Sequence, residues 1–222
     1  MALIVKICGL STPQTLDAAL EAGADMVGFV FFPPSPRNVS LEAARMLGLH
    51  VKGRVKKVAL SVDADDALLE SIVEALKPDL LQLHGKEPPA RVAALKRRFG
   101  LPVIKAIALA AQPDLAVLAD YAGTADRFLF DARAPREATR PGGLGRAFDW
   151  CLLENIDCGV PFLLSGGLDA GNVDEAVRIT RASGVDVSSG VERAPGEKDV
   201  EKIRAFVRAA RAAEAALAMS NA

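Results

Sequence analysis

Short apolar runs alternate with segments of helical apolar spacing along almost the whole chain. The runs are typical of buried strands, whereas apolar residues three or four apart, as at Leu16, Ala19 and Leu20, indicate a helix that buries one face. Strands are predicted at residues 3–8, 26–32, 58–62, 80–84, 102–106, 127–131, 161–165 and 184–188. Helices are predicted at residues 13–22, 41–49, 65–76, 88–99, 114–121, 149–155, 172–182 and 197–217.

Boundary residues support this division of the chain. Ser40 precedes one predicted helix, where its hydroxyl can cap the helix N-terminus, and Gly23 and Gly100 follow two others. Strands that are apolar along nearly their whole length are typical of parallel sheets covered by helices on their faces. The repeated strand–helix unit therefore predicts an α/β protein, a (β/α)8 TIM barrel forming a single domain over residues 1–222, with an open doubly wound sheet as the alternative.

Composition excludes several classes of partner. The net charge is −1 and only 5% of the residues are aromatic, so neither a general attraction to nucleic acid nor a stacking surface for single strands is implied. The chain has neither a signal-peptide pattern nor a run of about 18 apolar residues, which argues against a membrane partner. We expect a cytoplasmic protein whose partner is a small molecule.

The metal-binding and disulfide-forming residues are sparse. Cys8, Cys151 and Cys158 contain no Cys-x-x-Cys pair, and the two histidines are His50 and His84. This set suggests neither a disulfide framework nor a zinc site. We therefore expect no metal.

Barrel enzymes carry their chemistry at the C-terminal ends of the strands, which selects Cys8 and Asp131 as candidates. Because side chains alternate along a strand, Cys8 shares a face with Lys6, and both candidates can point into the barrel mouth. A cysteine thiol ordinarily has a pKa of roughly 8.5, and Lys6 is expected to stabilise its thiolate. Residue positions alone leave a small core residue open for Cys8 and a turn or helix cap open for Asp131.

Glycine-containing turns form a second group of candidates. They follow the last two predicted strands, at Gly166, Gly167, Ser189 and Gly190. Exposed backbone N–H groups before a helix N-terminus bind phosphate, and barrels commonly place a phosphate there. The loop at residues 141–145, with Gly142 and Gly143, is a candidate lid with backbone donors of its own. Ordinary turns and a plain connector are the alternatives.

Two polar residues near other strand ends can also bind a ligand. Arg37 follows Pro36 after the second strand, and its planar guanidinium suits a carboxylate, although a surface arginine is the simpler interpretation. His84 shares a face with Gln82 and can hydrogen-bond a substrate or serve only the structure.

Several motifs occur in a fixed order: KICGL at 6–10, FFPPSPR at 31–37, QLHG at 82–85, FD at 130–131, GGLG at 142–145, FDW at 148–150, SGGL at 165–168 and VDVSSGVE at 185–192. Together they resemble the phosphoribosylanthranilate isomerases, enzymes of tryptophan biosynthesis, and the resemblance runs through nearly the whole chain. Small departures are Leu144, Arg146, Ala147 and Ser165, which leave backbone-mediated phosphate binding intact.

The resemblance implies a (β/α)8 barrel that performs an Amadori rearrangement of N-(5-phosphoribosyl)anthranilate without a metal or organic cofactor. By resemblance, Asp131 is the general acid that opens the sugar ring, and Cys8 is the general base that removes the C2 proton. Arg37 would bind the anthranilate carboxylate. The turns at Gly166–Gly167 and Ser189–Gly190, with the loop at Gly142–Gly143, would hold the phosphate. A monomer or a homodimer is expected.

Two alternatives stay open at this point. One is a related isomerase of an aminoimidazole ribotide, for which paired aspartates are expected in place of Cys8. The other is a non-catalytic barrel that keeps only phosphate binding, against which the presence of Cys8, Arg37 and Asp131 argues.

Overall fold

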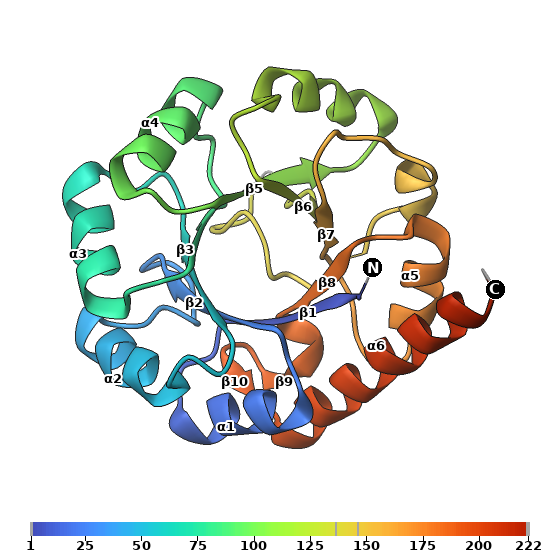
Figure 1. The fold of residues 1–222 in the computed structure, drawn as a ribbon, viewed down its shortest axis with the longest axis horizontal. Coiled ribbons are helices and arrows are strands. Elements are labelled where there is room, and N and C mark those ends of the chain that lie inside the picture. The colour runs from blue at the N-terminus through green and yellow to red at the C-terminus, as the bar shows by residue number, and fades with distance from the viewer. Residues whose placement is uncertain (1, 136, 146, 221–222) are drawn as a thin grey trace.

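The computed structural model describes residues 2–135, 137–145 and 147–220. Eight parallel strands close into a barrel in the order of the chain, and helices surround them as an outer ring (Figure 1). The strands are β1 (Ile4–Cys8), β2 (Met26–Phe31), β3 (Lys56–Ser61), β4 (Leu80–Leu83), β5 (Val103–Leu109), β6 (Arg127–Ala132), β7 (Phe162–Leu164) and β8 (Gly184–Val187).

Closure depends on the pairing of the first and last strands. β1 and β8 pair in parallel from Ile4 opposite Gly184 to Ile7 opposite Val187. An open sheet would leave both strands as edges with unpaired backbone groups. The (β/α)8 barrel is therefore confirmed, and the open doubly wound sheet is excluded.

The covering elements are six α-helices and three 3₁₀ segments within the described residues. They are α1 (Pro13–Ala22), α2 (Leu41–Val51), α3 (Asp66–Leu76), α4 (Pro89–Phe99), η1 (Gln112–Tyr121), η2 (Trp150–Leu153), α5 (Val173–Thr180), η3 (Ser189–Val191) and α6 (Val200–Ser220). The Ser40 side chain accepts a hydrogen bond from the backbone N–H of Ala43, as its predicted capping role requires.

Three predicted helices differ from the structure. The segments expected at 114–121 and 149–155 are the 3₁₀ segments η1 and η2. The helix expected from residue 197 begins only at Val200, because β10 (Glu197–Lys198) pairs antiparallel with β9 (Glu192–Ala194). Pro195 and Gly196 form the turn of this hairpin, and these two residues favour a turn over a helix start.

Because side chains alternate along the strands, one core lies inside the barrel and a second lies between the strands and the helices. Inside the barrel, apolar residues fill the half toward the N-terminal ends of the strands, among them Met26, Val58 and Leu129. Above them Cys8 packs with Val30 and Leu60 near the C-terminal ends of the strands. The outward-facing strand residues form a larger core with the helices. Because the half toward the N-terminal ends is filled, the space for a ligand inside the barrel lies at the C-terminal ends of the strands.

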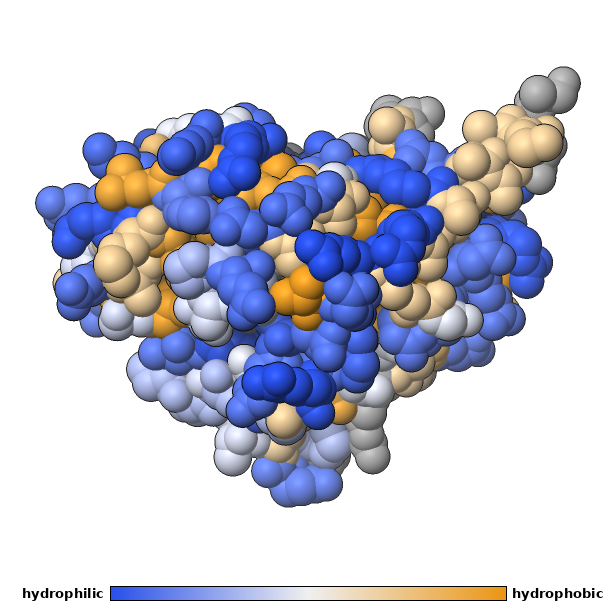
Figure 2. Space-filling model, turned by 90° about the horizontal axis from the view of Figure 1, so that it is seen from below, coloured by the Kyte–Doolittle hydropathy of each residue, from blue (hydrophilic) through white to orange (hydrophobic). Residues whose placement is uncertain are grey.

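The outer surface is that of a helical ring exposed to solvent. On the face shown in Figure 2, hydrophilic side chains surround small separate hydrophobic patches, and the end of α6 projects from the body. Within the described ranges, no helix is both long and apolar enough to cross a membrane.

Candidate active site

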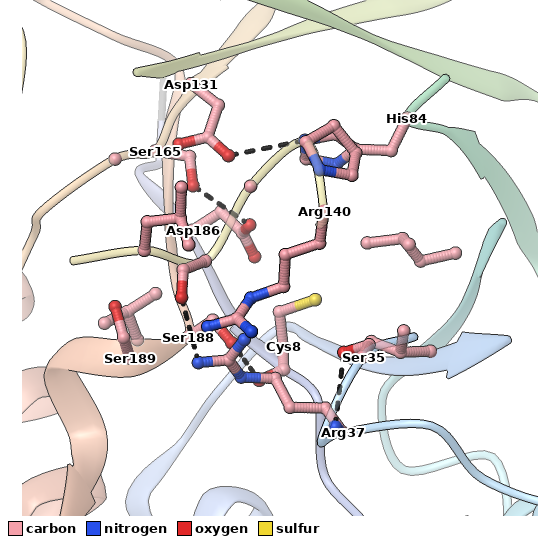
Figure 3. A pocket seen from close by; sticks show the side chains of 18 of the residues that line it. Cys8, Ser35, Arg37, His84, Asp131, Arg140, Ser165, Asp186, Ser188 and Ser189 are labelled. Carbon is pink, nitrogen blue, oxygen red and sulfur yellow. Dashed lines mark hydrogen bonds and ion pairs between the residues drawn. The ribbon is translucent and has the colours of Figure 1, made fainter. Parts of the chain in front are cut away.

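A cavity of about 70 Å³ lies at the C-terminal ends of the barrel strands. Its lining includes most of the predicted site residues: Cys8, Arg37, His84, Asp131, Gly142, Gly143, Gly166, Gly167 and Ser189. Gly190 is not among the lining residues, although it follows Ser189 directly in η3. Figure 3 shows side chains from strands on opposite sides of the barrel pointing into this space.

Below Cys8, a buried ion pair forms part of the site. Lys6 is fully buried, and its Nζ donates a hydrogen bond of 2.7 Å to Oδ1 of Asp186. The other carboxylate oxygen accepts from the Ser165 hydroxyl at 3.3 Å. Gly28 leaves the space that the sulfur and the ammonium share: a Cβ there would lie 2.9 Å from Sγ of Cys8 and 3.2 Å from Nζ of Lys6. The thiol therefore sits beside a cation whose charge is already paired.

This environment shifts two pKa values in the same direction. Burial raises the pKa of the Cys8 thiol, and Asp186 raises it further, while Lys6 and Lys198 only partly oppose them. Burial is also the largest influence on Lys6, but Asp186 and Cys8 outweigh it and raise the pKa of the ammonium. The expectation that Lys6 favours a thiolate has the right sign, but the effect of desolvation on the pKa of Cys8 is stronger.

Opposite Cys8, His84 faces the candidate acid. Oδ2 of Asp131 lies 3.3 Å from Nε2 of His84 (Figure 3). The amide nitrogen of Gln82 lies 3.2 Å from Nδ1 of the same ring. His84 therefore lies between Gln82 and Asp131. The other carboxylate oxygen of Asp131, Oδ1, accepts a hydrogen bond from the backbone N–H of Ala132 at 2.9 Å.

The loop after β6 covers the cavity. A Cβ at Gly142 would collide with the Asp131 carboxylate and lie 2.8 Å from Nε2 of His84, so only glycine allows this approach. Arg140 from the same loop extends into the cavity, and its buried Nε has no hydrogen-bond partner (Figure 3). The loop thus brings backbone close to Asp131 and a second guanidinium close to Arg37 and Cys8 (Figure 3).

Arg37 is buried, so the interpretation of this residue as a surface arginine is excluded. Its Nε and Nη2 donate to the two carboxylate oxygens of Glu192 at 2.7 and 2.8 Å. Nη2 also donates to the carbonyl oxygen of Gly143 at 3.1 Å. The guanidinium is therefore fixed on one side and meets the covering loop on the other.

The turns that were predicted to bind phosphate lie near Cys8. Gly166 and Gly167 follow β7, and Ser189 begins η3 after β8. The hydroxyl of Ser188, the residue before η3, donates to the carbonyl oxygen of Cys8 at 3.2 Å. This contact ties the turn after β8 to the end of β1.

Four residues of the site were not assigned a role from the sequence: Asp186, Glu192, Lys198 and Arg140. A signal existed for Asp186, because Lys6 on an inward face requires an anionic partner and the alternation of β8 turns Asp186 inward. Glu192 and Lys198 lie in the β9–β10 hairpin; the predicted helix at 197–217 covered Lys198, and no strand was predicted at Glu192. Lys105, by contrast, lies outside the barrel, where its Nζ donates to Oε2 of Glu87 at 2.8 Å.

No cluster of three or more His, Cys, Asp or Glu side chains able to hold a metal ion occurs in the described part of the chain. The cavity lining offers a thiol, two carboxyl groups, an imidazole and two guanidinium groups, from Cys8, Asp131, Asp186, His84, Arg37 and Arg140.

Comparison with known proteins identifies relatives along nearly the full length. The family model for N-(5'phosphoribosyl)anthranilate (PRA) isomerase matches residues 5–209. A curated N-(5'-phosphoribosyl)anthranilate isomerase of Bradyrhizobium sp. (strain ORS 278) is 70% identical over 214 residues, which cover 96% of this chain and 98% of that protein.

Solved structures agree with the sequence comparison. Phosphoribosyl anthranilate isomerase from Thermotoga maritima is 34% identical with a TM-score of 0.84, covering 95% of this chain and 100% of that one. A structure of such an isomerase with reduced 1-(o-carboxyphenylamino)-1-deoxyribulose 5-phosphate is 32% identical, with a TM-score of 0.83 and the same coverage. The chain belongs to the N-(5'-phosphoribosyl)anthranilate isomerase family.

Proposed function

We propose that the chain catalyses the Amadori rearrangement of N-(5'-phosphoribosyl)anthranilate to 1-(2-carboxyphenylamino)-1-deoxyribulose 5-phosphate in tryptophan biosynthesis. The observation that carries this proposal is the placement of Cys8 and Asp131, from β1 and β6, on one cavity that Arg37 also lines. A thiol and a carboxyl group on either side of one sugar ring suit the two proton transfers of an aldose–ketose isomerisation.

Asp131 acts as the general acid. Its proton passes to the furanose ring oxygen, the C1–O bond breaks, and the nitrogen lone pair forms a C1–N double bond, giving an open-chain Schiff base. His84, whose Nε2 lies 3.3 Å from Oδ2, is placed to donate a hydrogen bond to the carboxylate that remains.

Cys8 acts as the general base. Its thiolate removes the proton from C2, the electron pair moves into a C1–C2 double bond, and the cationic nitrogen is neutralised to give an enolamine. Tautomerisation of the enolamine yields the C2 ketone, so atoms and charge balance without a cofactor. The cationic Schiff base and the ammonium of Lys6 both favour the thiolate, which offsets the desolvation of Cys8.

The remaining predicted residues bind the two anionic ends of the substrate. Arg37 receives the anthranilate carboxylate, since a guanidinium matches a carboxylate edge to edge. The backbone N–H groups of the turns at Gly166–Gly167 and Ser189–Gly190 and of the loop at Gly142–Gly143 hold the phosphate.

Substrate entry requires the covering loop to move. The cavity of about 70 Å³ is well below the roughly 300 Å³ at which small-molecule pockets begin. Gly142 approaches Asp131, and the Gly143 carbonyl occupies a donor of Arg37. We infer that residues 140–145 withdraw to admit the substrate and then return over it.

The enzyme is proposed to act in the cytoplasm as a single barrel domain over residues 1–222, either as a monomer or as a homodimer.

The proposal is tested with purified protein and freshly made phosphoribosylanthranilate, following the loss of its fluorescence. An aminoimidazole ribotide is assayed in parallel. We expect turnover of the anthranilate compound; turnover of the imidazole compound alone, or of neither, would overturn the proposal.

A further inference from the structure

The β9–β10 hairpin holds a buried carboxylate against Arg37. The side chains of Arg37 and Glu192 are only 4% and 3% exposed. Two parallel hydrogen bonds join them, from Nε and Nη2 of Arg37 to Oε1 and Oε2 of Glu192. Such a paired geometry fixes the plane of the guanidinium as well as its position.

Glu192 is itself held from several sides. Nζ of Lys198, 1% exposed, donates to Oε1 of Glu192 at 2.8 Å, and the backbone N–H of Gly196 donates to Oε2 at 3.2 Å. Nζ of Lys202 donates to the backbone carbonyl of Glu192 at 2.7 Å. The carboxylate is therefore a fixed part of the hairpin, and its pKa is held below its ordinary value: Arg37 and Lys198 together outweigh burial, the largest single influence.

The arrangement leaves one edge of Arg37 for a ligand. A guanidinium offers two bidentate edges, and Glu192 occupies the Nε/Nη2 edge. The Nη1/Nη2 edge faces the cavity, where it meets only the loop: Nη2 donates to the carbonyl oxygen of Gly143 at 3.1 Å. A substrate carboxylate can replace that single neutral acceptor.

The charges of the group also bear on how an anion binds. Burial lowers the pKa of Lys198, and its contact with Glu192 only partly opposes this effect. Arg37 is therefore the cation of the group that faces a substrate carboxylate, and Lys198 helps to hold Glu192 in place through the hydrogen bond to Oε1.

We propose that Glu192 is a positioning residue that selects substrates bearing an aryl carboxylate, by holding Arg37 with its Nη1/Nη2 edge toward that group. This inference rests on the proposed function. It assigns to the hairpin after β8 a part in substrate specificity, transmitted through Arg37 and without contact with the substrate.

The test compares two substrates in two variants. Phosphoribosylanthranilate is assayed beside the N-phosphoribosyl derivative of aniline, which lacks the carboxylate. We expect Glu192→Gln to lower kcat/KM for the anthranilate compound by about 10-fold or more, chiefly through KM, because one charge-assisted pair no longer fixes Arg37. The same variant should change kcat/KM for the aniline compound less than about twofold.

Glu197→Gln provides the matched control. Glu197 lies in the same hairpin, but its partner is the exposed side chain of Arg193, and the same chemical change there should leave both substrates unaffected. In the double variant Arg37→Ala/Glu192→Gln, the ratio of kcat/KM for the anthranilate compound to that for the aniline compound should be no lower than in Arg37→Ala alone. The reason is that Glu192 acts only through Arg37.

The outcomes separate the inference from the proposed function. Turnover by the wild type with equal losses on both substrates in Glu192→Gln would overturn the positioning role and leave the isomerase activity standing. A wild type inactive on both compounds would overturn the proposed function. If Glu192→Gln fails to fold, Glu192→Asp withdraws the carboxylate by one methylene and carries the same prediction; failure of both to fold would make the role structural.

Discussion

The ammonium of Lys6 and the carboxylate of Asp186 meet at 2.7 Å on the floor of the cavity, immediately below Cys8. The two charges act on the thiol in opposite directions: Lys6 lowers the pKa of Cys8 and Asp186 raises it. The pKa of the proposed base is thus set by two opposing groups, one from β1 and one from β8.

The pH dependence of catalysis should reveal this opposition. A general base works deprotonated, so kcat/KM should rise with pH through the pKa of Cys8, which lies above its ordinary value. Lys6→Met removes the charge that lowers this pKa and should move the rise to higher pH. Asp186→Asn removes a charge that raises it and should move the rise to lower pH. Identical profiles for the two variants would contradict the assignment.

Removing either proton-transfer group should abolish most of the activity. Cys8→Ala and Asp131→Asn are each expected to reduce kcat by at least about 100-fold, the usual contribution of a general base or acid. Circular dichroism and thermal unfolding provide the check that both variants fold. Near-normal turnover in Cys8→Ala would show that another group takes the C2 proton.

A methyl group at residue 142 should disturb the closed loop. In Gly142→Ala the new Cβ meets the Asp131 carboxylate and the His84 ring, so the loop must retreat from the acid. We expect kcat/KM to fall about 10-fold while the unfolding midpoint hardly changes, since the loop lies over the surface. Gly171→Ala is the control, because a Cβ there meets only one oxygen of Asp169, at 3.3 Å.

Outside the barrel, Lys105 and Glu87 should contribute to stability and not to the chemistry. Their side chains are 2% and 4% exposed, and the Lys105 ammonium also donates to the carbonyl oxygen of Gly85. Lys105→Met leaves a buried carboxylate without its cation, which typically costs about 3–5 kcal/mol. Urea unfolding should show this loss, whereas Lys56→Met, in an exposed pair with Asp79, should show far less. If the kcat of Lys105→Met differed from that of the wild type, the assignment of this pair to stability alone would be wrong.

The regular alternation of strand and helix patterns was sufficient to predict the barrel. Most strand residues are apolar on both faces, because each strand is covered on both sides. The helical spacing at η1 and η2 is too short to distinguish 3₁₀ from α geometry. At residues 192–198, Pro195 and Gly196 are a local signal for the turn, whereas the contact of Glu192 with Arg37 joins distant parts of the chain and is not recorded in the periodicity.

The site shows the same division. Strand ends and glycine turns identified Cys8, Asp131 and Gly166 because the barrel places such positions at one mouth. Pairings between distant segments, such as Arg37 with Glu192, depend on which loops lie side by side after closure. Sequence spacing contains no measure of that, and only the assembled barrel reveals it.

The late position of the hairpin has a consequence for biosynthesis. Arg37 leaves the ribosome 155 residues before its partner Glu192. At translation rates of about 5–20 residues per second, the guanidinium waits roughly 8–31 s for the carboxylate that orients it. A nascent chain that already contains Cys8 and Asp131 therefore still lacks the carboxylate that fixes Arg37 until residue 192 has been synthesised.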